Sequence, residues 1–169
     1  MEKRIAMANN CAYNIVAVGK TKESVERVEK ILRYEDEEFF LNRVFSVFVV
    51  EDPSEKEGLW TIQLCGDTAW SAEPWANDFP DHDRRSKKGA HYSTLTEICR
   101  SLDIGIEVFA EEEAIGVQEH YVVNHIGVFT EKKEFRNLAL VTEGDMCGLA
   151  GGIEDFCVWE DEKKVYGLT

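Results

Sequence analysis

The chain has few basic side chains, with 19 lysines and arginines against 33 aspartates and glutamates among its 169 residues. The resulting net charge of −14 repels phosphate backbones, whose affinity for proteins comes largely from lysines and arginines that displace counterions. Direct binding to nucleic acid is therefore not expected. The acidity is confined to residues 35–169, because residues 1–34 carry seven basic and four acidic side chains. Two interpretations stay open, plain solubility and a protein partner with a basic surface.

Further absences narrow the class of protein. The five cysteines form no CxxC pair, which argues against a disulfide framework or a zinc knuckle and favours reduced thiols in the cytoplasm. No apolar run reaches 18 residues, and residues 1–10 lack the apolar stretch of a secretory signal, so no membrane association is expected. Neither a GxGxxG motif, a P-loop nor a GxSxG motif occurs, and we expect no cofactor.

A hydrophobic fraction of 44% is ample for a core, and the N-terminal part shows clear periodicity. Cys11 to Val18 is rich in apolar and β-branched residues and is closed by Gly19, which predicts a strand. Thr21 is a predicted N-cap for an amphipathic helix that runs to around Arg33. The apolar face of that helix holds Val25, Val28, Ile31 and Leu32.

The middle of the chain contains the strongest strand pattern. Phe39 to Val50 predicts one long strand, and Leu59 to Cys65 predicts its antiparallel partner. Residues 66–89 hold two prolines and a polar run, which predicts a long loop with at most one helical turn, with Gly66 and Asp67 turning at the end of the preceding strand.

The second half begins with a helix and continues with strands. Thr94 and Glu97 form a capping box at the start of a helix that Asp103 and Gly105 close. A strand follows, and then a predicted hairpin. The predicted strands of this half are residues 104–109, 117–123, 126–130 and 137–142, with short candidates at 156–159 and 165–168.

This order predicts an α+β, ferredoxin-like β-α-β-β-α-β fold with an antiparallel sheet and a β-rich C-terminal extension. The name denotes a topology here, because the cysteines that would hold an iron–sulfur cluster are absent. We expect a single domain over residues 1–169, with a core at 11–112 and a hairpin and extension at 113–169.

Four short stretches also resemble a known family in their combination and spacing. They are CAYNIVAVG at 11–19, CGDTAWS at 65–71, STLTEICRSLDIGIEVFAEE at 93–112 and EHY at 119–121. Together they resemble the YubB-type ferredoxin-like family, small proteins encoded mainly on plasmids, phages and other mobile elements. The resemblance covers roughly residues 11–130 and implies a fold and a mobile-element setting, but no activity. The family has a cysteine after Gly-Asp where this chain has Thr68, so no role of that cysteine carries over.

Three sets of residues could carry chemistry. Two histidines and three aspartates could bind a divalent metal, but four neighbouring basic residues compete with such an ion, and a solvated loop is the favoured interpretation. In a strand, Glu119 and Tyr121 share one face and His120 points to the other, so they do not converge with His125 into a proton-transfer site. Cys65 with Asp67 needs a base, which His91 or His120 could supply only if the fold brings one of them close, and the structural interpretation is favoured. The metal candidates are Asp78, Asp81, His82, Asp83 and His91, and their competitors are Arg84, Arg85, Lys87 and Lys88.

The acidic clusters are the fourth candidate, because carboxylates on one face could imitate a phosphate track and steer the protein to a basic cleft. Exposed aromatic side chains nearby could anchor such a contact. The acidic candidates are Glu35, Asp36, Glu37 and Glu38, then Glu111, Glu112 and Glu113, and the run of residues 160–162. The aromatic candidates are Trp70, Trp75 and Phe79.

The favoured function is a non-catalytic binding factor of a mobile genetic element, acting on a protein partner with a basic surface. Its sharpest form is an inhibitor of a host defence enzyme that binds nucleic acid, as anti-restriction and anti-CRISPR proteins are. The alternative is a small regulatory or assembly domain that forms homodimers through an exposed sheet edge. A metal-dependent or thiol-dependent enzyme is a third and less favoured hypothesis.

Overall fold

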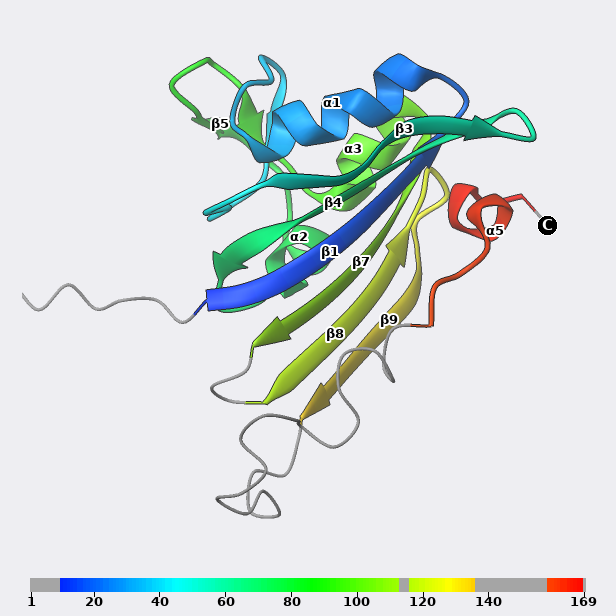
Figure 1. Ribbon diagram of the computed structural model, residues 1–169. Helices are drawn as coiled ribbons and strands as arrows, with labels where there is room; N and C mark the ends of the chain where they lie inside the picture. The colour runs from blue at the N-terminus through cyan, green and yellow to red at the C-terminus, as the bar shows by residue number, and fades with distance from the viewer. Residues whose placement is uncertain (1–9, 113–115, 136–157, 169) are drawn as a thin grey trace, which may run out of the picture.

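The computed structural model describes residues 10–112, 116–135 and 158–168 and is built on two sheets (Figure 1). The larger sheet is antiparallel, with the strand order β3-β4-β1-β7-β8-β9, and the smaller is mixed, with the order β2-β6-β5. The large sheet comprises β1 (Asn10–Gly19), β3 (Phe48–Lys56), β4 (Leu59–Ala69), β7 (Ile104–Glu112), β8 (Val117–Val123) and β9 (Val128–Phe135). The small sheet comprises β2 (Phe39–Phe40), β5 (Asp81–Arg85) and β6 (His91–Tyr92).

Four described helices flank the large sheet: α1 (Lys22–Leu32), α2 (Glu73–Asn77), α3 (Leu95–Leu102) and α5 (Glu162–Tyr166). The predicted N-caps are confirmed, since the Thr21 hydroxyl accepts from the Ser24 amide and the Thr94 hydroxyl accepts from the Glu97 amide. Within the described part of the chain, no helix has the length and apolar character needed to cross a membrane.

The two faces of the large sheet carry different layers. Along β1, the alternate residues Tyr13, Ile15 and Ala17 are buried in the main core beneath α1, α2 and α3. Val16 and Val18 point to the opposite face, where Val165 and Tyr166 of α5 pack on them. The sheet is therefore covered on one face by three helices and on part of the other by α5.

The predicted ferredoxin-like β-α-β-β-α-β arrangement is wrong. The chain is mostly β, with a six-stranded antiparallel sheet, a separate three-stranded sheet and only four short helices among the described residues. The predictions of a strand at 11–18, helices after Thr21 and Thr94, and a hairpin after residue 117 are confirmed. The error arises from two segments whose pairing depends on distant residues.

The first of these segments is Phe39 to Val50, which is not one strand. Its first two residues pair with β6 and its last three belong to β3, while the stretch between them runs alongside the end of β4, with Val44 bridged to Thr68. Gly66 permits this close approach, because a Cβ there would lie 2.0 Å from the Ser46 carbonyl oxygen. The predicted turn at Gly66 and Asp67 is therefore also wrong, and β4 continues to Ala69.

The second segment is residues 66–89, predicted as a loop. It contains the end of β4, the short helix α2 and the exposed strand β5. A charged strand such as Asp81–Arg85 has no apolar alternation, and only its pairing with β6 defines it. At the C-terminus, Val165 to Leu168 is not a strand, because residues up to Tyr166 belong to α5. The predicted strand at 137–142 lies outside the described residues, as do residues 156 and 157.

Candidate functional site

The first predicted acidic cluster, at the end of α1, is partly structural. Asp36 is 7% exposed and accepts two hydrogen bonds from the Arg27 guanidinium, at 3.0 and 3.1 Å. Burial alone would raise the pKa of Asp36, but the bonds from Arg27 and from the amides of Phe39 and Glu38 outweigh it and lower that pKa. Asp36 therefore holds the chain after α1 rather than facing a partner. Its neighbours Glu35, Glu37 and Glu38 are exposed.

The described residues of the second cluster are not exposed. Glu111 and Glu112 are both buried near the end of β7, and Glu113 lies outside the described residues. The three clusters also fall at three separate places, after α1, at the end of β7 and at the start of α5 (Figure 1). They do not form one continuous acidic face.

The three aromatic candidates differ sharply in exposure. Trp75 is 1% exposed, donates from its indole to the Asn42 carbonyl at 2.9 Å and packs edge-on against Tyr13. It is a core residue and is not available to a partner. Trp70 and Phe79 are 47% and 89% exposed and remain available.

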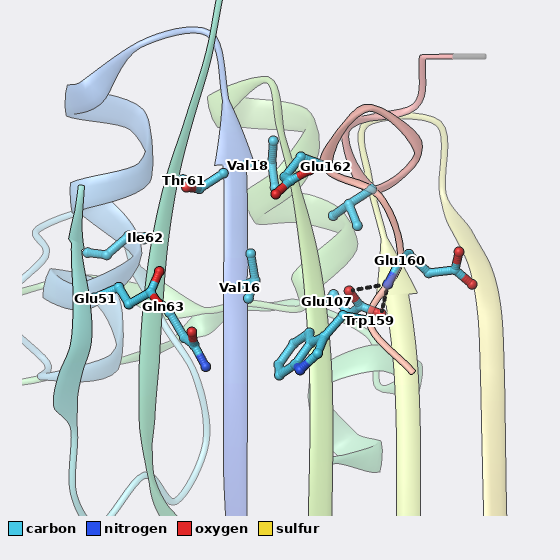
Figure 2. Close-up of a pocket in the computed structure, with 11 residues that line it drawn as sticks. Val16, Val18, Glu51, Thr61, Ile62, Gln63, Glu107, Trp159, Glu160 and Glu162 are labelled. Carbon is cyan, nitrogen blue, oxygen red and sulfur yellow. Dashed lines mark hydrogen bonds between the residues drawn. The ribbon is translucent and has the colours of Figure 1, made fainter. Parts of the chain in front are cut away.

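The third cluster, residues 160–162, borders a hollow on the face of the sheet that α5 partly covers. This cavity of about 160 Å³ lies between α5 and strands β3, β4, β1 and β7 (Figure 2). Figure 2 shows Glu51 and Gln63 entering it from one side and Trp159 bordering the other, with Glu162 above and Glu107 nearby. Among the described residues, no lysine or arginine lines it.

The position of α5 forms one wall of this cavity. Val165 and Tyr166 are buried, and the Tyr166 hydroxyl donates to an Asp103 carboxylate oxygen at 2.8 Å. Burial and this hydrogen bond raise the pKa of Tyr166 to about 12. Gly105 lets the helix approach β7 closely, since a Cβ there would lie 2.1 Å from the Val165 carbonyl oxygen. These contacts fix α5 on the sheet.

Glu107 belongs to a buried polar chain beside the cavity. Its carboxylate accepts from the His120 ring at 2.7 Å and from the Glu160 amide at 3.1 and 3.2 Å. His120 stacks on Phe109 with ring centroids 4.1 Å apart, and Phe109 meets Trp159 edge-on at 4.7 Å. This chain of contacts holds Trp159 beside the cavity. The Glu160 side chain points away from it and pairs with Lys164 at 2.7 Å (Figure 2).

A second hollow of about 410 Å³ adjoins the first and shares Glu51, Thr61 and Glu162 with it. Its lining includes the lysines Lys56 and Lys163, and Lys163 pairs with Glu57 at 2.7 Å. We call the two hollows together the C-terminal groove. The carboxylates along its lining are Glu51, Glu57, Glu107, Asp161 and Glu162.

A different set of side chains meets between β5, β6 and α3. The Nε2 atoms of His82 and His91 both lie 2.9 Å from the same carboxylate oxygen, Oε1 of Glu97. The two imidazole rings have centroids 4.2 Å apart. Two of the predicted metal candidates are thus brought together, joined by a glutamate that the sequence presented only as part of a capping box.

The three aspartates predicted beside these histidines do not join them. Asp78 accepts from the Tyr92 hydroxyl, and Asp81 accepts from the backbone amides of Asp83 and Arg84 within β5. No carboxylate contact of Asp83 with either histidine is present in the described structure. Among the basic competitors, Arg84 donates to Asn42 and Arg85 to the Gly89 carbonyl, so both point elsewhere.

The two other catalytic candidates are structural. Glu119 and Tyr121 share one face, as predicted, and the Tyr121 hydroxyl donates to Glu119 at 2.7 Å, while His120 lies on the other face with Glu107. Glu119 is fully buried and also accepts from Ser71 and from the Ala72 amide. Cys65 is half-buried on β4, and neither His91 nor His120, which bind Glu97 and Glu107, is placed to activate it.

Several residues of the C-terminal groove and of the histidine cluster could not be recognised from the sequence. Glu51, Glu107 and Trp159 are far apart along the chain and meet only because β3, β7 and the segment before α5 are neighbours in space. One signal could have found Glu97, since it lies in the first turn of a helix six residues after His91.

Neither a family model, a curated protein nor a solved structure matches the chain. The resemblance to the YubB-type family therefore remains a prediction from four short stretches.

Proposed function

We propose that the protein is a non-catalytic binding factor that takes lysine or arginine side chains of a basic partner protein into the C-terminal groove. The single observation that carries this proposal is the composition of the smaller hollow. The described residues of its lining combine carboxylates with one aromatic ring and include no basic side chain. Carboxylates attract a cationic head group, and the face of an indole adds a cation–π contact worth about 0.5–2 kcal/mol.

The size of the hollow supports a side chain rather than a cofactor. Pockets for drug-sized ligands and cofactors usually measure about 300–1,000 Å³. The smaller hollow measures about 160 Å³, and its larger neighbour opens beside it with mixed charges. One cationic side chain fits the smaller hollow, while flanking residues of the same partner would lie along the larger one.

The finer form of the proposal is an inhibitor that occupies the nucleic-acid cleft of a host enzyme. It is supported by the net charge of −14 and by the position of the groove in the acidic part of the chain. Because the predicted clusters are scattered, the mimicry would depend on the C-terminal groove and not on one broad acidic face.

Calorimetric titration with hexalysine and hexaarginine amides tests the proposal. We expect the double variant Glu51→Gln with Glu162→Gln to weaken binding at least about tenfold, which corresponds to about 1.4 kcal/mol. Trp159→Ala should weaken it further for both peptides. Citrulline-containing peptides of the same length should not bind, since they lack the charge.

The matched control is Glu35→Gln with Glu37→Gln, which removes the same charge from exposed positions outside the groove. Salt screens charges over about 8–10 Å, so this control should change affinity less than about twofold. Equal losses in the two double variants would mean that only net charge matters, and the groove proposal would then be wrong. No binding of either peptide would also overturn it.

A homodimer is the second candidate, and the edge strand β3 favours it. Within the described residues β3 pairs only with β4, and Phe48, Val49 and Val50 are exposed on it. A second copy could add its own β3 to this edge. Glu51, Asp52 and Glu55 on the same strand would oppose such pairing by repulsion. Light scattering on the sample used for the titration decides between a monomer and this dimer.

A further inference from the structure

We propose that His82, His91 and Glu97 form a binding site for one zinc ion. This site lies away from the C-terminal groove, and it needs neither the groove nor a protein partner. The three residues come from three elements, β5, β6 and α3, and their ligand atoms all lie within 4.8 Å of one another. Zinc would thus connect the small sheet to α3.

The distances suit a tetrahedral ion with little movement. Zinc binds imidazole nitrogen and carboxylate oxygen at about 2.0–2.2 Å, which places neighbouring ligands of a tetrahedron about 3.3–3.5 Å apart. Each histidine Nε2 is 2.9 Å from Oε1 of Glu97. An outward shift of about half an ångström at each contact therefore makes room for the ion.

The unused oxygen of Glu97 is the second observation that points to a ligand. Its Oε2 atom is buried and has no hydrogen-bond partner within the described part of the chain, while Oε1 receives both histidines. A buried polar atom without a partner costs about 1–3 kcal/mol. A bound metal ion would give Oε2 a partner, because a carboxylate can coordinate through either oxygen or through both.

The surrounding structure positions the ligands in advance. Glu97 is held in the first turn of α3, whose end the Thr94 hydroxyl caps. His91 is 12% exposed in its side chain and packs edge-on against Phe39 at 5.4 Å. His82 is 65% exposed in its side chain, so an ion reaches the site from solvent on that side. The fourth position of the tetrahedron would be left to water.

The ligand types select the metal class. Two imidazoles and one carboxylate suit zinc and its first-row neighbours, whereas magnesium and calcium prefer oxygen ligands throughout. A metal binds the lone pair of each Nε2 atom, so that nitrogen must carry no proton. In a neutral histidine the ring proton then sits on Nδ1, and a charged histidine releases its Nε2 proton. Protons therefore compete with the metal for these nitrogens, and affinity should fall as the solution becomes more acidic.

Titration of the chelator-treated full chain with Co²⁺, followed by visible absorption, tests the site, and Zn²⁺ should then displace the cobalt. We expect one equivalent to bind with the strong d–d bands of a tetrahedral ion and without the near-ultraviolet band of a cobalt–thiolate bond. His82→Ala and Glu97→Gln should each lower affinity at least about 100-fold, since loss of a supporting contact alone costs about 10–100-fold.

The matched control is His125→Gln, which removes a histidine outside the site and should leave the binding unchanged. His82 is exposed, so His82→Ala keeps a folded protein for comparison even if a variant at His91 does not fold. Three outcomes would overturn the proposal: no stoichiometric binding, binding unchanged in both ligand variants, or a thiolate band that assigns the metal to cysteine. Any of them would mean that the three side chains are joined by hydrogen bonds only.

Discussion

The two faces of the large sheet are built from the same strands but differ in chemistry. On the face beneath α1, α2 and α3, alternate residues such as Ile15, Ile62 and Val108 are apolar and almost fully buried. On the opposite face the same strands present Gln63 and Glu107 beside the C-terminal groove. One face resembles an ordinary protein core, while the other combines a small apolar cluster with polar groups.

From this difference we expect one face to contribute mainly to stability and the other mainly to binding. Apolar burial contributes about 25 cal/mol per Å² and needs no specific partner, so the helix-covered face supplies most of the stability. A buried carboxylate such as Glu107, which is 1% exposed, is tolerated only because His120 and the Glu160 amide satisfy it. Variants on the first face should therefore change stability, and variants on the second should change binding.

The largest effect is expected from Trp75→Ala on the helix-covered face. Trp75 is nearly fully buried against Tyr13, and its truncation leaves a large cavity and an unpaired Asn42 carbonyl. We expect a loss of about 3–5 kcal/mol in the free energy of unfolding, measured by chemical denaturation. The matched change Trp70→Ala removes a half-exposed indole and should cost less than about 1 kcal/mol. Similar costs for both tryptophans would contradict the assignment of Trp75 to the core.

A smaller effect is expected from Asp36→Asn at the end of α1. The substitution removes the negative charge that receives Arg27, and hydrogen bonds to charged groups contribute about 1.5–3 kcal/mol. The pKa of Asp36 is lowered in the folded protein, so its contribution is present above the unfolded value of about 3.9 and is lost as the pH falls through the folded value.

Denaturation of the wild type and of Asp36→Asn should accordingly differ at neutral pH and converge in acid. Glu37→Gln, the same chemical change on the next residue, is exposed and should leave stability unchanged within about 0.5 kcal/mol. A pH-independent difference between wild type and Asp36→Asn would show that charge is not the cause.

Much of the helix-covered face could be predicted from the sequence. The strand at β1, the helix after Thr21 and the helix after Thr94 follow from local periodicity and capping, which depend only on neighbouring residues. The small sheet could not be predicted this way. β2 has two residues, and β5 is a run of charged residues, so both exist only through pairing with β6.

The histidine site and the C-terminal groove also differ in how much of each the sequence predicts. The sequence predicts His82 and His91 as metal candidates because they are close along the chain. It does not predict Glu97, because that residue is already explained by the capping box of a helix. The predicted aspartates were wrong companions, since Asp78 accepts from the Tyr92 hydroxyl and Asp81 accepts from the amides two and three residues after it. The groove could not be predicted, because its parts meet only after the sheet is formed and α5 is in place.

Gly105→Ala, beneath α5, is expected to cost less stability than Trp75→Ala or Asp36→Asn. It should nevertheless weaken binding in the groove. The added methyl would lie 2.1 Å from the Val165 carbonyl, so the helix must move away from β7. Because α5 is short and only Val165 and Tyr166 are buried, we expect a cost of about 1–2 kcal/mol, in the lower part of the range for overpacked sites.

Displacing α5 should open the groove, so Gly105→Ala should weaken hexalysine binding at least about tenfold while near-ultraviolet circular dichroism keeps its native signal. The control Tyr166→Phe removes only the hydrogen bond to Asp103, a loss of about 1 kcal/mol, and leaves the ring packed on the sheet. It should bind hexalysine nearly as the wild type does. If Gly105→Ala also bound with unchanged affinity, α5 would not be a wall of the binding site, and the functional difference between the two faces would not depend on that helix.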